Sequence, residues 1–230
     1  MHQEFLKLVT RKFSQLYHAS IDHFIAPPFC AYCKKFLSQR MILCVDCFES
    51  IQPIVSVQLT VTKTQSITVL AVSGYQEPLK TLILSKAWSD ITACNQLAQL
   101  IWENTYFKHR PCDYMIPVPL HWMRKAKRGY NQAEEIAQSL ALYRHAEVAN
   151  IISRVKNTPF QSSLAFDKRL DNVKHAFILK TSIDKALYEN KHLILVDDLM
   201  TTGSTLAACA KQLMQLKPAS ITAVVVSRVV

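Results

Sequence analysis

The pattern of apolar and polar residues predicts strands and helices that alternate along most of the chain. Apolar runs rich in β-branched residues are typical of buried strands, and they occur at "SITVLAVSGY", "CDYMIPVPL", "VANIISRV", "HLILVDD" and "SITAVVVSRVV". Helical periodicity separates them, at "EPLKTLILSKAW", "SDITACNQLAQLIWENTY", "NQAEEIAQSLALYR" and residues 204–216. This alternation predicts an α/β fold with a parallel sheet that is covered on both faces. The preceding "VSVQLTV" suggests a hairpin with the first long strand.

The first 24 residues have a different pattern, in which apolar and basic positions fall on different sides of a helix. The apolar positions near one face are Phe5, Leu8, Val9, Phe13, Leu16 and Tyr17. We expect a helix that docks on the next segment, and the alternative is a basic amphipathic helix at the inner membrane face. Apolar runs long enough to span a membrane are absent from the sequence, as is a signal peptide, so we expect a cytosolic protein.

The charge narrows the choice of partners. Lys and Arg number 27 against 17 Asp and Glu, so the formal charge is 27 − 17 = +10, with a pI near 9.3. A charge of this sign favours a nucleic acid, a phosphorylated metabolite or an acidic membrane surface, and it does not choose among them.

Four of the seven cysteines form two CxxC pairs in "PPFCAYCKKFLSQRMILCVDC", at Cys30, Cys33, Cys44 and Cys47. Two such pairs can place four thiolates around one ion, and a module as short as residues 25–55 needs a staple of this kind. The spacing therefore predicts a structural zinc site. Because four sulfurs fill the coordination shell, a catalytic zinc is not expected. The predicted organisation is a helix over residues 1–24, a zinc module over 25–55 and a main domain over 56–230.

The stretch "LILVDDLMTTGSTL", residues 193–206, joins a strand to a helix through two acids and a turn rich in hydroxyl groups. Asp197 and Asp198 follow the strand, where ligands of parallel sheets bind, and two adjacent carboxylates can accept hydrogen bonds from two ribose hydroxyls. The hydroxyls of residues 201–205 and the first helical amides can hold a phosphate. Gly203 permits a positive φ or a close backbone approach. The segment therefore predicts a site for a ribose 5-phosphate.

A second segment, "IPVPLHWMRKAKRGYNQAEEIA", carries four cations: Arg124, Lys125, Lys127 and Arg128. Such a loop suits a departing pyrophosphate. With Trp122 and Tyr130 beside it, the loop also suits single-stranded nucleic acid, and the residues leave both interpretations open. A third basic stretch, residues 154–177, is either an ordinary surface excursion or a functional segment, which would be a flexible lid or a nucleic-acid contact, and the sequence favours neither.

The acidic turn resembles the phosphoribosyl pyrophosphate (PRPP) signature of type I phosphoribosyltransferases. The resemblance implies that Asp197 and Asp198 bind the ribose hydroxyls. It also implies a loop for the 5-phosphate, made by Leu199, Met200, Thr201, Thr202, Gly203, Ser204 and Thr205. Thr201 stands where 6-oxopurine salvage enzymes carry a third acid, which argues against purine salvage.

The order of all these motifs, together with "GYQEPLKTLILSKAW", resembles the ComF/GntX family, also called ComFC, from about Phe24 to the last residue. The resemblance implies a type I phosphoribosyltransferase-like domain that binds PRPP with magnesium. It also implies a role in competence, in which transforming single-stranded DNA is brought into the cytoplasm, with other competence proteins at the inner membrane face as partners. Lys86 matches a lysine of the family's helix motif, and Lys34 replaces a glycine that many members carry.

Three functions remain open from the sequence. The first is a competence protein that binds single-stranded DNA and PRPP. The second is a working phosphoribosyltransferase on an unidentified acceptor. The third is a regulator that senses PRPP without turnover.

Overall fold

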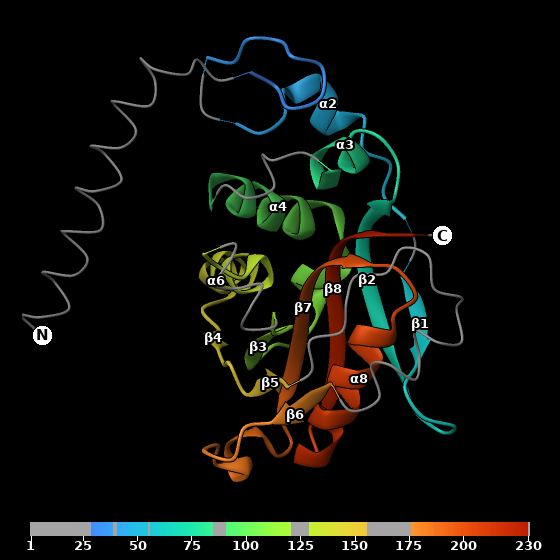
Figure 1. Ribbon diagram of the computed structural model, residues 1–230, viewed down its shortest axis with the longest axis vertical. Coiled ribbons are helices and arrows are strands. Elements are labelled where there is room, and N and C mark those ends of the chain that lie inside the picture. The colour runs from blue at the N-terminus through green and yellow to red at the C-terminus, as the bar shows by residue number, and fades with distance from the viewer. Residues whose placement is uncertain are drawn as a thin grey trace, which may run out of the picture.

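The computed structural model describes residues 29–38, 41–54, 56–84, 91–120, 129–155 and 176–229. Its main body is a six-stranded sheet of order β1-β2-β8-β7-β3-β4 (Figure 1). The strands of this sheet are β1 Val57–Thr60, β2 Ser66–Gly74, β3 Tyr114–Pro117, β4 Glu147–Val148, β7 His192–Met200 and β8 Ser220–Arg228. The predicted helix over residues 1–24 lies outside the described residues.

Helices cover both faces of the sheet. They are α2 Val45–Glu49, α3 Leu79–Leu84, α4 Ile91–Asn104, α6 Gln132–Arg144 and α8 Ser204–Leu213, with 3-10 turns η2 Tyr106–His109, η3 Lys185–Tyr188 and η4 Met214–Leu216. Helices α4 and α6 pack on one face, and α8 packs on the other (Figure 1). Within β7, Ile194 and Val196 belong to the core under α4 and α6, whereas Leu193 and Leu195 belong to the core under α8. This alternation is the expected consequence of a strand buried on both sides.

The parallel pairing predicted from the alternating elements is confirmed. Strands β2, β8, β7, β3 and β4 run parallel in that order, and β1 forms an antiparallel hairpin with β2 at one edge. The carboxyl ends of the central strands therefore share one edge of the sheet, and their starts share the opposite edge.

One strand prediction is wrong in detail. "VANIISRV" forms two short strands rather than one, because the chain turns at Ala149, whose carbonyl accepts the amide of Ile151 (3.0 Å). The first part is β4 of the main sheet. The second part, β5 Ile152–Arg154, pairs antiparallel with β6 Phe177–Leu179 in a separate two-stranded sheet.

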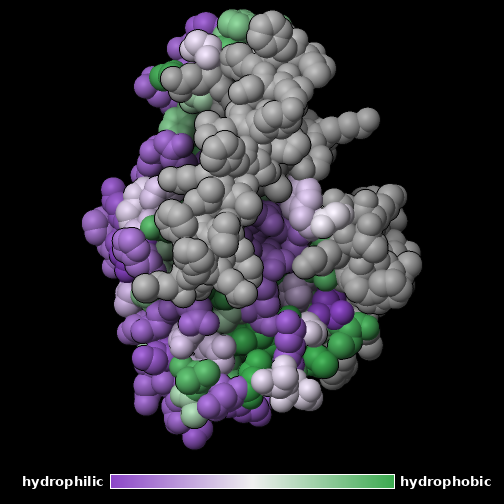
Figure 2. All heavy atoms as spheres, turned by 90° about the vertical axis from the view of Figure 1, so that its left-hand side faces the viewer, coloured by the Kyte–Doolittle hydropathy of each residue, from purple (hydrophilic) through white to green (hydrophobic). Residues whose placement is uncertain are grey.

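The four-cysteine segment packs against the main domain rather than standing apart from it. Leu43 and Ile51 share a buried apolar cluster with Leu70 of β2 and Leu97 of α4, and the amide of Ile42 donates to the side chain of Gln96. Figure 1 shows α2 of this segment beyond α3 and α4. Viewed from the side of α6 and β4, hydrophilic side chains cover most of the described surface, with apolar patches near one end (Figure 2). Within the described ranges, none of the helices combines the length and apolarity that crossing a bilayer requires.

Candidate functional site

The two adjacent acids lie toward the carboxyl end of β7, close to the predicted position but inside the strand. Pairing with β3 ends at Val196, whereas pairing with β8 continues to Met200. Asp197 pairs in register with Val225 of β8, and both acids are partly buried. Each carboxylate accepts the amide of the next residue: Asp197 Oδ1 from Asp198 (2.9 Å) and Asp198 Oδ1 from Leu199 (2.7 Å). These bonds hold both carboxylates close to the backbone.

The environment of Asp197 disfavours its charge. Burial, followed by the neighbouring charge of Asp198, raises the pKa of Asp197 well above its ordinary value, while the charge of Arg154 acts in the opposite direction. A ligand that donates hydroxyls or brings a cation would favour the ionised carboxylate. Binding of such a ligand should therefore lower the pKa of Asp197.

Arg154 is a component of the site that the sequence identifies only as part of a basic surface stretch. It stands at the end of β5, and its guanidinium lies 5.3 Å from the ring centre of Phe177 on β6. The same arginine lowers the pKa of Cys209 in α8, which burial and then Asp197 raise. Arg154, Asp197 and Cys209 therefore share one region on the α8 side of the sheet.

Gly203 is required at its position for two reasons. Its φ is +75°, in the left-handed region where side chains are rare. A Cβ there would lie 2.6 Å from Cδ1 of Leu59, a residue of β1 that the sequence does not associate with the site. The β1–β2 hairpin therefore presses directly on the turn, and glycine is the residue that fits beneath it.

The hydroxyl groups after β7 surround the start of α8. Thr202 Oγ1 lies 3.0 Å from Ser204 Oγ and accepts, at 3.4 Å, the amide of Ser204. The first helical bond of α8 runs from the amide of Ala207 to Gly203 (2.8 Å). The amides before Ala207 precede this first helical bond, which is the geometry that binds an anion at a helix start.

The basic loop begins and ends beside this site. Val118 follows β3 and donates its amide to Val196 of β7 (2.8 Å), and Asn131 at the start of α6 donates its side-chain amide to Val118 (3.0 Å). These bonds fix both flanks of segment 121–128 next to the strand of Asp197. The predicted contacts of that segment, Arg124, Lys125, Lys127 and Arg128, lie outside the described residues, as does Lys86.

The four cysteines come together as their spacing predicts. All four sulfurs lie within 4.8 Å of one another, and Cys33 Sγ is 3.6 Å from Cys44 Sγ. A tetrahedron with Zn–S bonds of about 2.3 Å has S–S edges of about 3.8 Å, so the cluster fits a metal ion of this kind. Burial opposes ionisation of Cys30, yet backbone hydrogen bonds at Cys44, Cys33 and Tyr32 outweigh it and lower its pKa to about 6. Burial and then the neighbouring cysteines raise the pKa of Cys47, so a bound cation is needed to keep all four thiols ionised.

Lys34 follows the first CxxC pair with φ +63°, in the left-handed region. Its amide donates to Cys30 (3.0 Å), and this turn closes the knuckle. The glycine that many ComF/GntX members carry at this position would adopt the same conformation without strain.

Comparison with known proteins agrees with this geometry. The phosphoribosyl transferase domain family matches residues 95–229, which include β7, its acids and α8. Competence protein F of Haemophilus influenzae is 31% identical over 201 residues, covering 82% of this chain and 80% of that protein. The chain belongs to the ComF family of proteins with a phosphoribosyltransferase domain.

Two further relatives support the ComF assignment. DNA utilization protein YhgH of Salmonella typhimurium is 30% identical over 203 residues, covering 84% of this chain and 86% of that protein. Competence protein ComFC of Bacillus subtilis is 31% identical over 116 residues, covering 50% of this chain and 44% of that protein. The expected type I phosphoribosyltransferase fold, with a four-cysteine cluster near the N-terminus, is confirmed.

Proposed function

We propose that this ComF-family chain is a competence or DNA-utilisation protein that binds PRPP with magnesium and acts with single-stranded DNA during its import into the cytoplasm. The observation that carries the proposal is the meeting of three features at one sheet edge. These features are the carboxylates of Asp197 and Asp198, the turn of Gly203 at the start of α8, and the flanks of the basic loop. The names of the relatives, which refer to competence and to DNA utilisation, support the pathway.

Each part of the site has a distinct task in this proposal. Asp197 and Asp198 accept hydrogen bonds from the two ribose hydroxyls, and Arg154 lowers the electrostatic cost of ionising Asp197. The 5-phosphate rests on the hydroxyls and amides of residues 201–205. Magnesium, when bound with PRPP, neutralises part of the diphosphate charge. The basic residues between 124 and 128 contact the diphosphate or the DNA backbone.

Zinc in the four-cysteine cluster has a structural role in this proposal. Four thiolates leave no open position for substrate, and the cluster adjoins the apolar core under α4. The ion would stabilise this end of the core, as metals do in small modules.

Calorimetric titration of PRPP and magnesium tests the ribose assignment. We expect wild-type protein to bind and Asp198→Asn to lose at least about tenfold in affinity, because a carboxylate that accepts two hydrogen bonds becomes an amide. Asp184→Asn is the matched control. It removes one carboxylate at the opposite edge of the sheet, and asparagine can still cap η3 as Asp184 does through Ala186 (3.0 Å). Equal affinity in wild type and Asp198→Asn would contradict the assignment.

Binding of a labelled oligothymidylate at several salt concentrations tests the DNA assignment. We expect affinity to fall with salt. Replacing Arg124 and Arg128 by Ala should weaken binding and lower the salt slope by about one for each phosphate that is no longer neutralised. Salt-independent binding would count against the DNA assignment.

An active phosphoribosyltransferase on an unidentified acceptor is the second candidate, and the intact pair of acids and phosphate turn favour it. In such a reaction the acceptor's nucleophile bonds to ribose C1 while the bond from C1 to the diphosphate oxygen breaks. Release of diphosphate that depends on an acceptor and is abolished in Asp198→Asn would establish it. Binding without release for nucleobase, amine and DNA acceptors would favour a PRPP-sensing regulator.

A further inference from the structure

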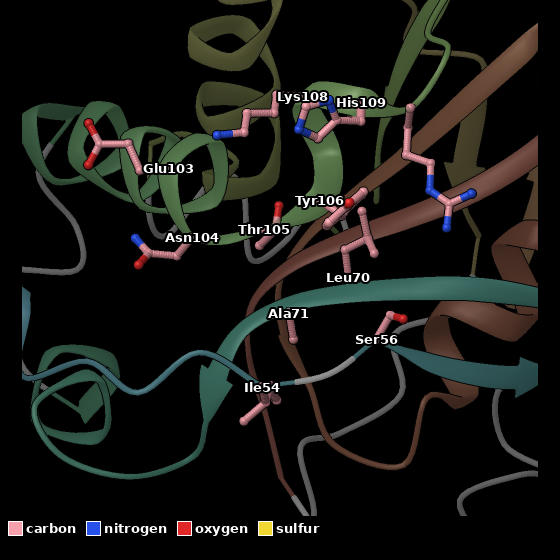
Figure 3. A pocket seen from close by; sticks show the side chains of 11 residues that line it. Ile54, Ser56, Leu70, Ala71, Glu103, Asn104, Thr105, Tyr106, Lys108 and His109 are labelled. Atoms are coloured by element: carbon pink, nitrogen blue, oxygen red, sulfur yellow. The ribbon is translucent and has the colours of Figure 1, made fainter.

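Two cavities meet at Arg110, away from the acids. The larger, about 810 Å³, lies at the edge where the central strands begin and is lined by Ser66 of β2, His192 of β7 and Ser220 of β8, together with Lys217. The smaller, about 620 Å³, lies between β2 and the end of α4 with η2 (Figure 3). Arg110 lines both cavities. Neither Asp197 nor Asp198 lines either cavity, and the larger cavity lies toward the opposite end of β7 from these acids.

The larger cavity has the chemistry of an anion site. Its lining includes Arg110, His192 and Lys217 with the hydroxyls of Thr64, Ser66, Thr68, Ser220 and Thr222. Acids adjoin this lining without forming part of it: Glu189 pairs with Lys217 at 3.8 Å, and Asp113 accepts the amide of His192 (2.8 Å). The Nε atom of Arg110 is buried and has no hydrogen-bond partner among the described residues. Such a group is costly to leave unsatisfied, and a phosphate oxygen would satisfy it.

Hydrogen bonds from Arg144 fix the backbone of the segment that carries Lys108 and Arg110. Arg144, at the end of α6, donates one guanidinium nitrogen to the carbonyl of Lys108 (2.9 Å) and another to the carbonyl of Arg110 (2.7 Å). These two bonds fix the backbone of segment 108–110, in which Lys108 is exposed and Arg110 is half-buried.

The smaller cavity adds an aromatic surface to the cations, and one acid, Glu103, also lines it. Tyr106 is 71% exposed, and its ring centre lies 5.0 Å from that of His109. Figure 3 shows Tyr106, Lys108 and His109 together at one side of this cavity. An exposed tyrosine ring gains little from folding, whereas a nucleobase could stack on it.

We propose that this edge of the sheet is a binding track for single-stranded nucleic acid, with phosphates at Lys108, Arg110 and Lys217 and a base on Tyr106. The class of partner, single-stranded DNA, is taken from the proposed function. The surface assigned to it here is distinct from segment 121–128. Cations beside an exposed aromatic ring suit a single strand, whose bases are free to stack. A duplex hides the faces of its bases, and an acidic peptide would use the cations but gain little from the ring.

The test uses full-length zinc-loaded protein and a fluorescein-labelled 20-mer of oligothymidylate, with anisotropy read at several salt concentrations. We expect Tyr106→Ala to weaken binding by about fivefold or more without changing the salt slope, because it removes one stacked base. The double variant Lys108→Gln with Lys217→Gln should weaken binding and lower the salt slope by about one for each cation removed from a phosphate. Lys35→Gln is the charge control: this lysine is exposed, pairs with Asp46 (3.0 Å) and lines neither cavity.

Three results would overturn the proposal. The first is wild-type affinity in both Tyr106→Ala and the double lysine variant. If Arg124→Ala weakens binding in the same series, the DNA role stands and only this track is rejected. The second is competition by polyglutamate as effective as that by unlabelled oligothymidylate of equal charge, which would make the surface a general anion site. The third is an equal reduction of affinity in Lys35→Gln. PRPP titration on each variant should give wild-type affinity, which shows that the fold and the other edge are intact.

Discussion

The two edges of the sheet differ in the charged groups that lie next to the proposed ligands. Where the strands end, two carboxylates stand before the start of α8; where they begin, Arg110, His192 and Lys217 surround a cavity. Helix polarity contributes to this division, because helix starts favour anionic groups and helix ends favour cations. Lys108 follows the end of α4, and Arg144 closes α6. Helix polarity does not require the exposed ring of Tyr106 or the cavity beside Arg110, and these two features support the proposed binding at this edge.

Metal removal should have the largest effect, and it should affect both edges. The four-cysteine cluster adjoins the core beneath α4, so a chelator or Cys44→Ser should lower the free energy of unfolding by more than about 4 kcal/mol. Thermal melts with and without added zinc measure this. Unchanged melting after verified metal removal would show that the cluster is not a structural staple.

Gly203→Ala should disable only the edge that carries the acids. A methyl group at φ +75° and 2.6 Å from Leu59 should cost about 2 to 4 kcal/mol and weaken PRPP binding, while oligothymidylate binding persists. Gly129→Ala is a matched control, since φ is +85° there but the added Cβ meets nothing within 4 Å. Denaturant unfolding compares the two variants. Equal destabilisation of Gly203→Ala and Gly129→Ala would show that the contact with Leu59 adds nothing to the cost of the Gly203 substitution.

Asp197→Asn should change stability and PRPP binding in opposite directions. Because the folded protein raises the pKa of Asp197, the fold favours its protonated form, and stability is lost as pH rises from the unfolded pKa through the raised folded one. Above that window the Asn variant should melt higher than wild type, yet bind PRPP more weakly. Wild-type PRPP affinity should fall as pH drops through the raised pKa, and the variant should lack this dependence. Melting curves and titrations across pH measure both effects, and a variant that melts lower than wild type above the window would contradict the raised pKa.

Lys34→Gly should produce the smallest effect and act on neither edge. Lys34 has a left-handed φ of +63°, and relief of this strain should stabilise the knuckle by about 1 kcal/mol. The greater conformational entropy of glycine in the unfolded chain offsets part of this gain. Competition with a chromogenic chelator should show tighter metal retention. Weaker metal retention would mean that the lysine side chain itself supports the site, for instance through its bond to the carbonyl of Ala31 (2.8 Å).

The parts of the molecule that could be predicted are those whose signal is local. The acids, Gly203 and the four cysteines are defined by spacing within a few residues, and the long strands by continuous apolar runs. The sequence assigns Arg154 only to a surface stretch, because its hairpin partner β6 has three residues and segment 156–175 separates the two strands. Leu59 and Arg110 gain their roles through contacts with distant segments, and these depend on the packing of hairpin, sheet and helix ends.

A crystal structure of the full-length protein with magnesium and PRPP would test the central claim most directly. We expect the ribose hydroxyls on Asp197 and Asp198, and the 5-phosphate within hydrogen-bonding distance of the amides and hydroxyls of residues 201–205. A saturated crystal with PRPP bound elsewhere, or with none at the acids, would contradict the assignment of this edge.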